Sequence, residues 1–199
     1  TGCKKEKSNT PSSTYASVSD FFSQNNVSSQ SFTINATTGG TITGAKGTTV
    51  TFPPNVFINA NGTMVTGNVD LKLKEVFSKG DMIYANVFPV AYTGNLLNSA
   101  GEYFLSASQN GNQVNVKKGH FFQMHLPAQA VDPNMQFFMR LDSAGANWQL
   151  PDTAVVQVDS QFVISPVGGF NFTSSPDSIY IINCDSLGWG NADVFMSPT

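Results

Sequence analysis

The sequence is poor in charged residues, and this scarcity limits what the protein can bind. Charged side chains make up only 12% of its 199 residues, about half of the roughly 25% that is usual for a soluble domain. Neutral Ser, Thr, Asn, Gln and Gly therefore have to supply the polar surface, while hydrophobic residues at 40% are enough to form a core. No apolar run approaches the roughly 20 residues of a membrane-spanning helix, so we expect the body of the chain outside the bilayer.

The shortage of cations excludes nucleic acid as a partner. The formal charge is -3 and the pI is about 5.1, whereas binding to phosphates requires clustered Lys and Arg side chains that displace counterions. Arg140 is the single arginine, so only one guanidinium fork could read a phosphate. We expect no nucleic-acid partner.

The side chains most used in catalysis are also scarce. The only histidines are His120 and His125, and residues five apart on one strand point to opposite faces, so they could not share a metal ion. The sequence has no Gly-x-Ser-x-Gly or Ser-x-x-Lys motif and no glycine-rich phosphate loop before a helix. These absences favour a protein that is not an enzyme and carries no cofactor.

A pair of carboxylates could still serve glycoside hydrolysis. The candidate carboxylates fall on separate expected strands or turns, so we favour the interpretation that each is a solvated or turn residue. They are Glu75, Glu102, Asp142 and Asp185.

Alternation of apolar and polar residues is the main structural signal. Between Val69 and Leu73 the apolar side chains alternate with Asp70 and Lys72, a period of two that is typical of a half-buried strand. Turn sequences such as Asn61-Gly62 separate the runs at short intervals. We expect strands at 31–36, 47–52, 65–77, 82–92, 102–109, 112–117, 121–126, 135–141, 153–158, 161–165, 169–173, 178–184 and 192–196.

This pattern predicts an all-β fold, an antiparallel β-sandwich, built as one continuous unit or as two packed sandwich-like subdomains. One helical turn is expected at Ser17 to Gln24. The expected division is a tether at 1–17, a β-sandwich domain at 18–130 and a smaller all-β segment at 131–199. The last two could equally form one continuous domain, because Pro127 and Pro133 mark only a weak boundary.

The amino terminus indicates the cellular location of the protein. Thr1-Gly2-Cys3 resembles the end of a bacterial lipobox, in which small residues precede a Cys that receives a lipid, and the following Ser- and Thr-rich segment is typical of a tether. The alternative is that Cys3 is an accident of cloning. The second cysteine, Cys184, follows an apolar run and is expected to be a buried, unreactive thiol.

Four segments carry a resemblance to two known families. Gly39 to Ile42 and Gly47 to Pro54 resemble the opening of the sandwich domains of ankyrins and netrin receptors, although Asn55 stands where that family often has Gly. Gly101 to Ala107 and Ile182 to Asp185 are more similar to envelope lipoproteins of the Bacteroidetes type. The resemblance implies an exported, tethered β-sandwich. It implies no self-cleavage, since His120-Phe121-Phe122 lacks the Ser nucleophile of some eukaryotic relatives.

Two small sets of residues each suggest a ligand. Trp148, Trp189 and Tyr103 could stack on a sugar if exposed, although ordinary anchoring of loops explains both Trp residues as well. Oxygen ligands for Ca²⁺ could come from the only local cluster of suitable residues near a strand end, which is Asp185, Asn191 and Asp193.

Together these features predict a non-enzymatic cell-envelope lipoprotein that acts in adhesion, binding or assembly. It would be anchored to the outer membrane through Cys3, on the cell surface or the periplasmic face, with a protein or glycan partner. The alternative is a carbohydrate-binding protein of the cell surface.

Overall fold

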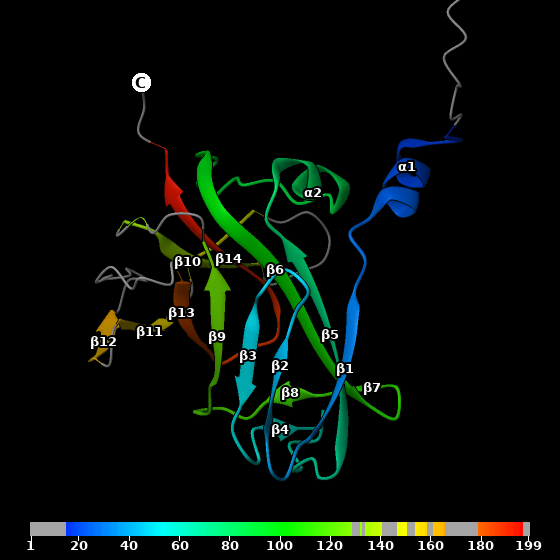
Figure 1. Ribbon diagram of the computed structural model, residues 1–199, viewed down its shortest axis with the longest axis vertical. Helices are drawn as coiled ribbons and strands as arrows, with labels where there is room; N and C mark the ends of the chain where they lie inside the picture. Colours follow the sequence, from blue (N-terminus) through cyan, green and yellow to red (C-terminus); the bar gives the residue numbers. More distant parts are fainter. Residues whose placement is uncertain are drawn as a thin grey trace, which may run out of the picture.

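The fold is an antiparallel β-sandwich with few helices, as the alternation predicts (Figure 1). The computed structural model describes residues 15–128, 132, 134–140, 147–150, 154–158, 161–165 and 179–196, the two segments 154–158 and 161–165 by their backbone. The expected strand at 169–173 and the tether residues before Tyr15 lie outside the described residues.

Sixteen elements follow one another along the described part of the chain. The two helices are α1 (Val18–Asn25) and α2 (Lys79–Tyr84). The first eight strands are β1 (Gln30–Asn35), β2 (Gly40–Thr43), β3 (Thr49–Phe52), β4 (Phe57–Ile58), β5 (Asn68–Val76), β6 (Leu97–Gln109), β7 (Asn112–Gln113) and β8 (Asn115–Val116). The last six are β9 (Phe122–Pro127), β10 (Gln136–Arg140), β11 (Ala154–Val158), β12 (Gln161–Ser165), β13 (Ile179–Cys184) and β14 (Gly188–Phe195).

Two sheets face each other across the core. Sheet A has the order β1-β5-β6-β14-β10, with β7 beside β6, and sheet B has the order β12-β11-β13-β9-β3-β2. Strands that follow residue 131 enter both sheets, because β14 pairs with β6 and β13 pairs with β9. The two expected segments therefore contribute to the same two sheets.

The core contains the alternate residues that the period of two places on the inner faces. Leu71 and Leu73 of β5 and Leu105 of β6 meet Met124 of β9 and Ile182 of β13, and all five are fully buried.

The helix expected at Ser17 to Gln24 is present as α1, and the Ser17 hydroxyl accepts a hydrogen bond from the Asp20 N–H at its start. The expected strand at 82–92 is wrong. Its first part is α2, which begins at a capping box: Ser78 accepts from the Asp81 N–H, and the Asp81 carboxylate accepts from the Ser78 N–H. This helix and the loop after it cover the outer face of sheet A.

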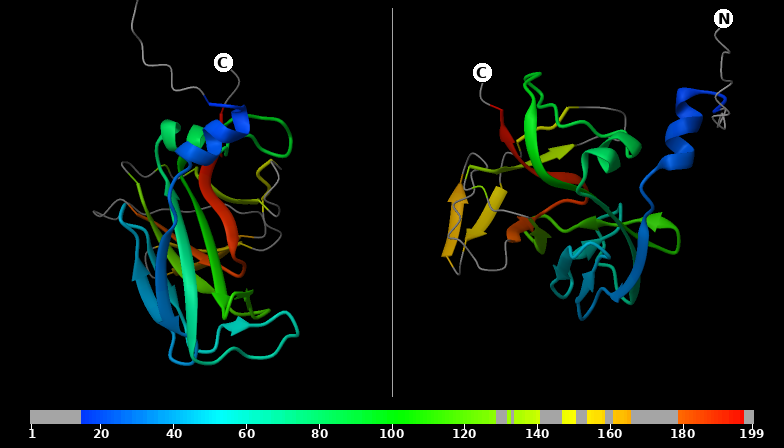
Figure 2. Two further views of the ribbon diagram at one scale, coloured as in Figure 1. Left: turned by 90° about the vertical axis from the view of Figure 1, so that its right-hand side faces the viewer. Right: turned by 45° about the horizontal axis from the view of Figure 1, so that its top comes forward.

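The two ends of the sandwich differ. Helices α1 and α2 and the C-terminal end of β14 lie at one end, which we call the helical end, while β4, β7 and β8 lie at the other, the distal end (Figures 1 and 2). Among the residues that the structure describes, no helix is long and apolar enough to cross a membrane.

Candidate functional site

The aromatic residues offered by the sequence as a sugar platform are largely buried. Trp148 exposes 0% and Tyr103 exposes 2% of its surface, while Trp189 is half-buried. Tyr103 lies in the core, where its hydroxyl is 3.3 Å from the Sγ of Cys184. Burial removes Tyr103 and Trp148 from the sugar hypothesis, because a sugar ring cannot reach their faces.

Trp148 instead anchors the loop that follows α2. Its indole Nε1 donates a hydrogen bond to the Phe88 carbonyl at 3.0 Å. Its backbone N–H donates to Val90 at 3.0 Å, and its carbonyl accepts from Tyr92 at 2.8 Å. Residues 78–96 and 147–150 are joined in this way into one cover over sheet A, which we call the cap.

The calcium candidates divide into one exposed residue and two buried ones. Asp185 is exposed and precedes β14, whereas Asn191 and Asp193 expose 0% of their surface. At a rise of about 3.3 Å per residue, Asp193 lies about 16 Å beyond Gly188, the first residue of β14. Asp185, which precedes the strand, is therefore separated from the two buried residues. The side-chain Nδ2 of Asn191 donates to Asp193 Oδ2 at 2.6 Å.

The strand register brings in a residue that the sequence did not connect with this pair. Glu102 of β6 lies opposite Asn191 of β14 and is also fully buried. Among the described residues, no group of three His, Cys, Asp or Glu side chains is arranged to hold a metal ion. A cation here would therefore need amide or hydroxyl oxygens as well.

The two buried carboxyl groups favour their protonated forms. Burial and, to a smaller extent, the nearby charge of Asp193 raise the pKa of Glu102 to about 8, although the charge of Arg140 lowers it. Burial likewise raises the pKa of Asp193 to about 7, although the Ser99 hydroxyl lowers it. Arg140 itself lies 5.6 Å from the ring centre of Trp148, a distance at which a cation and an aromatic face attract.

Glu75 shows the opposite behaviour. It accepts hydrogen bonds from the N–H groups of Lys46 and Thr48, both at 2.9 Å, and from Gln30 at 2.7 Å. Burial raises the pKa of Glu75, but these donors outweigh it and the pKa lies below its ordinary value. Glu75 thus has a structural role, which is to fix the β2–β3 turn to sheet A, and Glu102 lacks such donors.

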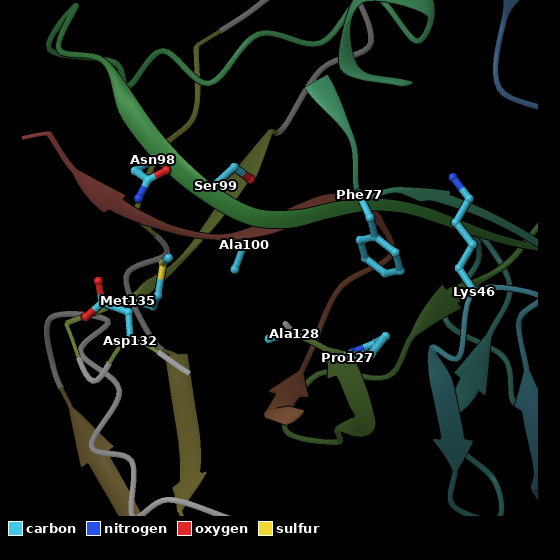
Figure 3. Close-up of a pocket in the computed structure, with 9 residues that line it drawn as sticks. All are labelled: Lys46, Phe77, Asn98, Ser99, Ala100, Pro127, Ala128, Asp132 and Met135. Atoms are coloured by element: carbon cyan, nitrogen blue, oxygen red, sulfur yellow. The ribbon is translucent and has the colours of Figure 1, made fainter. Parts of the chain in front are cut away.

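A cleft of about 590 Å³ opens between the sheets at the helical end. Figure 3 shows Phe77, which follows β5, and Ala100 of β6 above Pro127 of β9 and Ala128, which follows β9. The Nζ of Lys46 points away from the middle of the cleft, because it forms a 2.7 Å ion pair with Asp81. Among the described residues that line the cleft, none is a histidine or a cysteine that could act as a base or a thiol nucleophile.

A second hollow at the helical end is apolar. It measures about 350 Å³ and lies between α2, the loop after it and the end of β14, with Ile83, Phe88, Leu96 and Met196 in its walls. These four side chains expose 48%, 51%, 58% and 54% of their surfaces. Tyr84 and Tyr92, also exposed, belong to the same cap. We call this the apolar groove.

The hollow at the distal end is rich in amides. It measures about 340 Å³, and its walls include Asn59, Asn61, Gln109, Asn110, Asn112 and Gln113. Asn59 and Gln109 form hydrogen bonds to the neighbouring backbone. Asn112 and Gln113 are exposed, and Asn112 Nδ2 donates to the Asn110 carbonyl at 3.5 Å. We call this the amide groove.

The cysteines, the histidines and Asp142 are the remaining candidates from the sequence. Cys184 is buried and carries a free thiol, as expected, and burial raises its pKa to about 12. His125 is bonded to Gln123 at 2.9 Å on β9, and His120 lies in the turn before that strand. Cys3 and Asp142 lie outside the described residues.

No model of a protein family matches this chain, and no curated protein matches it either.

Proposed function

We propose that the chain is a non-enzymatic binding module of the cell envelope, held by a lipid on Cys3 at the outer membrane, with its helical end resting on the lipid surface. The observation that carries the proposal is the apolar groove. Its walls include residues of α2, and α2 lies at the end of the sandwich where the described chain enters α1 (Figure 1), and so on the side from which a tether would extend.

The chemistry of this end suits a lipid interface. Ile83, Phe88, Leu96 and Met196 expose apolar surface that water solvates poorly. Tyr84 adds an amphipathic ring of the kind that is enriched at the level of lipid headgroups. The part of the tether that follows Cys3, residues 4–16, spans at most about 45 Å when fully extended, which keeps this end within reach of the membrane.

The experiment uses the full-length acylated protein in phosphatidylethanolamine vesicles, with benzoylphenylalanine at Phe88 or, as the matched control, at Asn61 of the amide groove. Photolysis should produce lipid adducts at Phe88 and not at Asn61. Equal adducts at both positions, or adducts at neither, would refute the proposed orientation. Cross-links from Phe88 to a second copy of the chain would show that the groove is a protein interface instead.

The Cys3 anchor is tested separately. Labelling with a fatty acid should tag the wild type and not Cys3→Ala, and protease treatment of intact cells would then distinguish the cell surface from the periplasmic face. An unlabelled wild type would contradict the anchor.

Carbohydrate binding is the second candidate function, and it is proposed for the amide groove instead of Trp148, Trp189 and Tyr103. Amide side chains both donate and accept hydrogen bonds, as sugar hydroxyls require, and the amide groove concentrates them at the end away from the proposed membrane. Glycan-array binding that is lost in Asn112→Ala with Gln113→Ala, and retained in Gln24→Ala on α1, would support it. An array without reproducible binding would reject it.

A further inference from the structure

Five polar side chains meet beneath the cap although they come from three separate strands. Glu102 of β6 is paired with Asn191 of β14, and Ser99 of β6 is paired with Asp193, which is itself paired with Gln136 of β10. Paired residues on neighbouring strands share a face, with Cβ atoms about 5 Å apart, and so do residues two apart on one strand. All five side chains therefore point from the outer face of sheet A.

A β-bulge produces this alignment. The register shifts between Ala192 and Asp193, so that Ala100 and Gly101 both face the core while Ser99 and Glu102 both face the cap. Gly101 is needed there, because a Cβ at this position would lie 2.4 Å from the Phe77 ring. The extra residue brings two polar side chains of β6 beside the polar side chains of β14.

The cluster is rich in acceptor oxygens that have no donor. Both carboxylate oxygens of Glu102, Oδ1 of Asp193 and Oδ1 of Asn191 are buried without a hydrogen-bond partner, and so is Oε1 of Gln136. The carboxylates and the amide of Asn191 belong to residues that expose 0% of their surface. Buried acceptors without a partner are costly, and buried carboxylates more so. A single cation would satisfy several of these oxygens at once.

The kind of cation follows from the ligands. Every candidate atom is an oxygen, from carboxylate, amide or hydroxyl groups, and this set suits Ca²⁺, which takes six to eight oxygens including water. Transition metals favour nitrogen and sulfur ligands, which the cluster lacks. The guanidinium carbon of Arg140 lies 5.6 Å from the ring centre of Trp148 and 6.0 Å from that of Trp189, and its charge also acts on Glu102.

We propose that Glu102, Asn191 and Asp193 bind a calcium ion beneath the cap, with Ser99 and Gln136 as further oxygen ligands, directly or through water. The ion links β6, β14 and β10 under the loop that Trp148 anchors. It would therefore stabilise the wall of the apolar groove, to which Ser99 also belongs.

Two measurements on the EDTA-treated full-length chain test the site. Terbium should give luminescence sensitised by Trp189, which lies two residues from Asn191 on β14 and therefore on the same face of the sheet. Calcium at about 100 times its Kd should raise the melting temperature by about 5 to 10 °C, and magnesium should raise it less. Absence of both signals in the wild type would overturn the proposal.

Variants separate ligation from a general effect of salt. Glu102→Gln keeps the volume of the side chain and removes its charge, so the variant should fold and should lose both the terbium signal and the calcium shift. Asp193→Asn gives the same test from the other carboxylate if the first variant does not fold. Asp185→Asn is the matched control, since Asp185 is exposed beyond the cluster, and it should retain both signals. A full calcium shift in the Glu102 and Asp193 variants would overturn the site.

Discussion

Without a bound cation, the stability of the protein should fall as the pH rises from 5 to 8, because Glu102 is buried without donors. Its pKa rises from the ordinary 4.5 to about 8 in the fold. The folded protein therefore holds a proton that the unfolded chain has released over this range, and proton release then favours unfolding. At about 1.4 kcal/mol per pH unit, the loss between pH 5 and pH 8 amounts to at most about 4 kcal/mol.

Glu102→Gln should remove most of this loss. The neighbouring groups that face Glu102 are Asp193, whose own raised pKa acts in the same direction, and Arg140, which opposes it. The variant should thus be more stable than the wild type at pH 8, with little difference at pH 5. Its remaining dependence on pH should come from Asp193.

Urea unfolding in EDTA at pH 5 and pH 8, followed by circular dichroism, measures both effects. EDTA is required because a cation would compete with the proton. A wild type that gains stability between pH 5 and pH 8, or a variant with an unchanged loss, would refute the reasoning that Glu102 is an uncompensated buried carboxyl.

Three further predictions concern packing and capping. Gly190→Ala would place a Cβ 2.5 Å from the ring of Tyr103, so the variant should lose about 1 to 3 kcal/mol in urea unfolding; an unchanged midpoint would show that Tyr103 is not packed there. In a Cys3→Ser background, Cys184 should react with Ellman's reagent only after unfolding, since burial raises its pKa to about 12; rapid reaction of the native protein would contradict this. Ser78→Ala should lower stability by about 1 kcal/mol in thermal unfolding through loss of the α2 cap, and an equal melting temperature would argue against the capping box.

Local sequence predicts much of the sandwich. The alternation from Val69 to Leu73 places three apolar side chains on one face whatever lies beside the strand, because the side-chain period of an extended chain is two. Helix α1 could be predicted in the same way from Ser17 and the apolar spacing of Val18, Phe21 and Phe22. These features depend on residues within one turn or one strand.

The cap could not be predicted as readily. The segment 82–92 contains enough β-branched and aromatic residues to suggest a strand, yet its start is helical because Ser78 and Asp81 cap each other. This capping box is visible in the sequence, but Lys79-Gly80-Asp81 also has the composition of a turn. Packing of Met82 and Val87 against Val76 favours the helix and loop.

The sequence by itself determined the fold class, the buried Cys184 and the lack of clustered cations, since each depends on composition or on short-range spacing. Only the tertiary structure decided that Tyr103 and Trp148 are buried, and that Glu102 lies beside Asn191 and Asp193 while Asp185 does not. The physical reason is register: hydrogen bonding between β6 and β14 brings together residues about 90 positions apart in the chain, and a single bulge fixes which side chains face the cap.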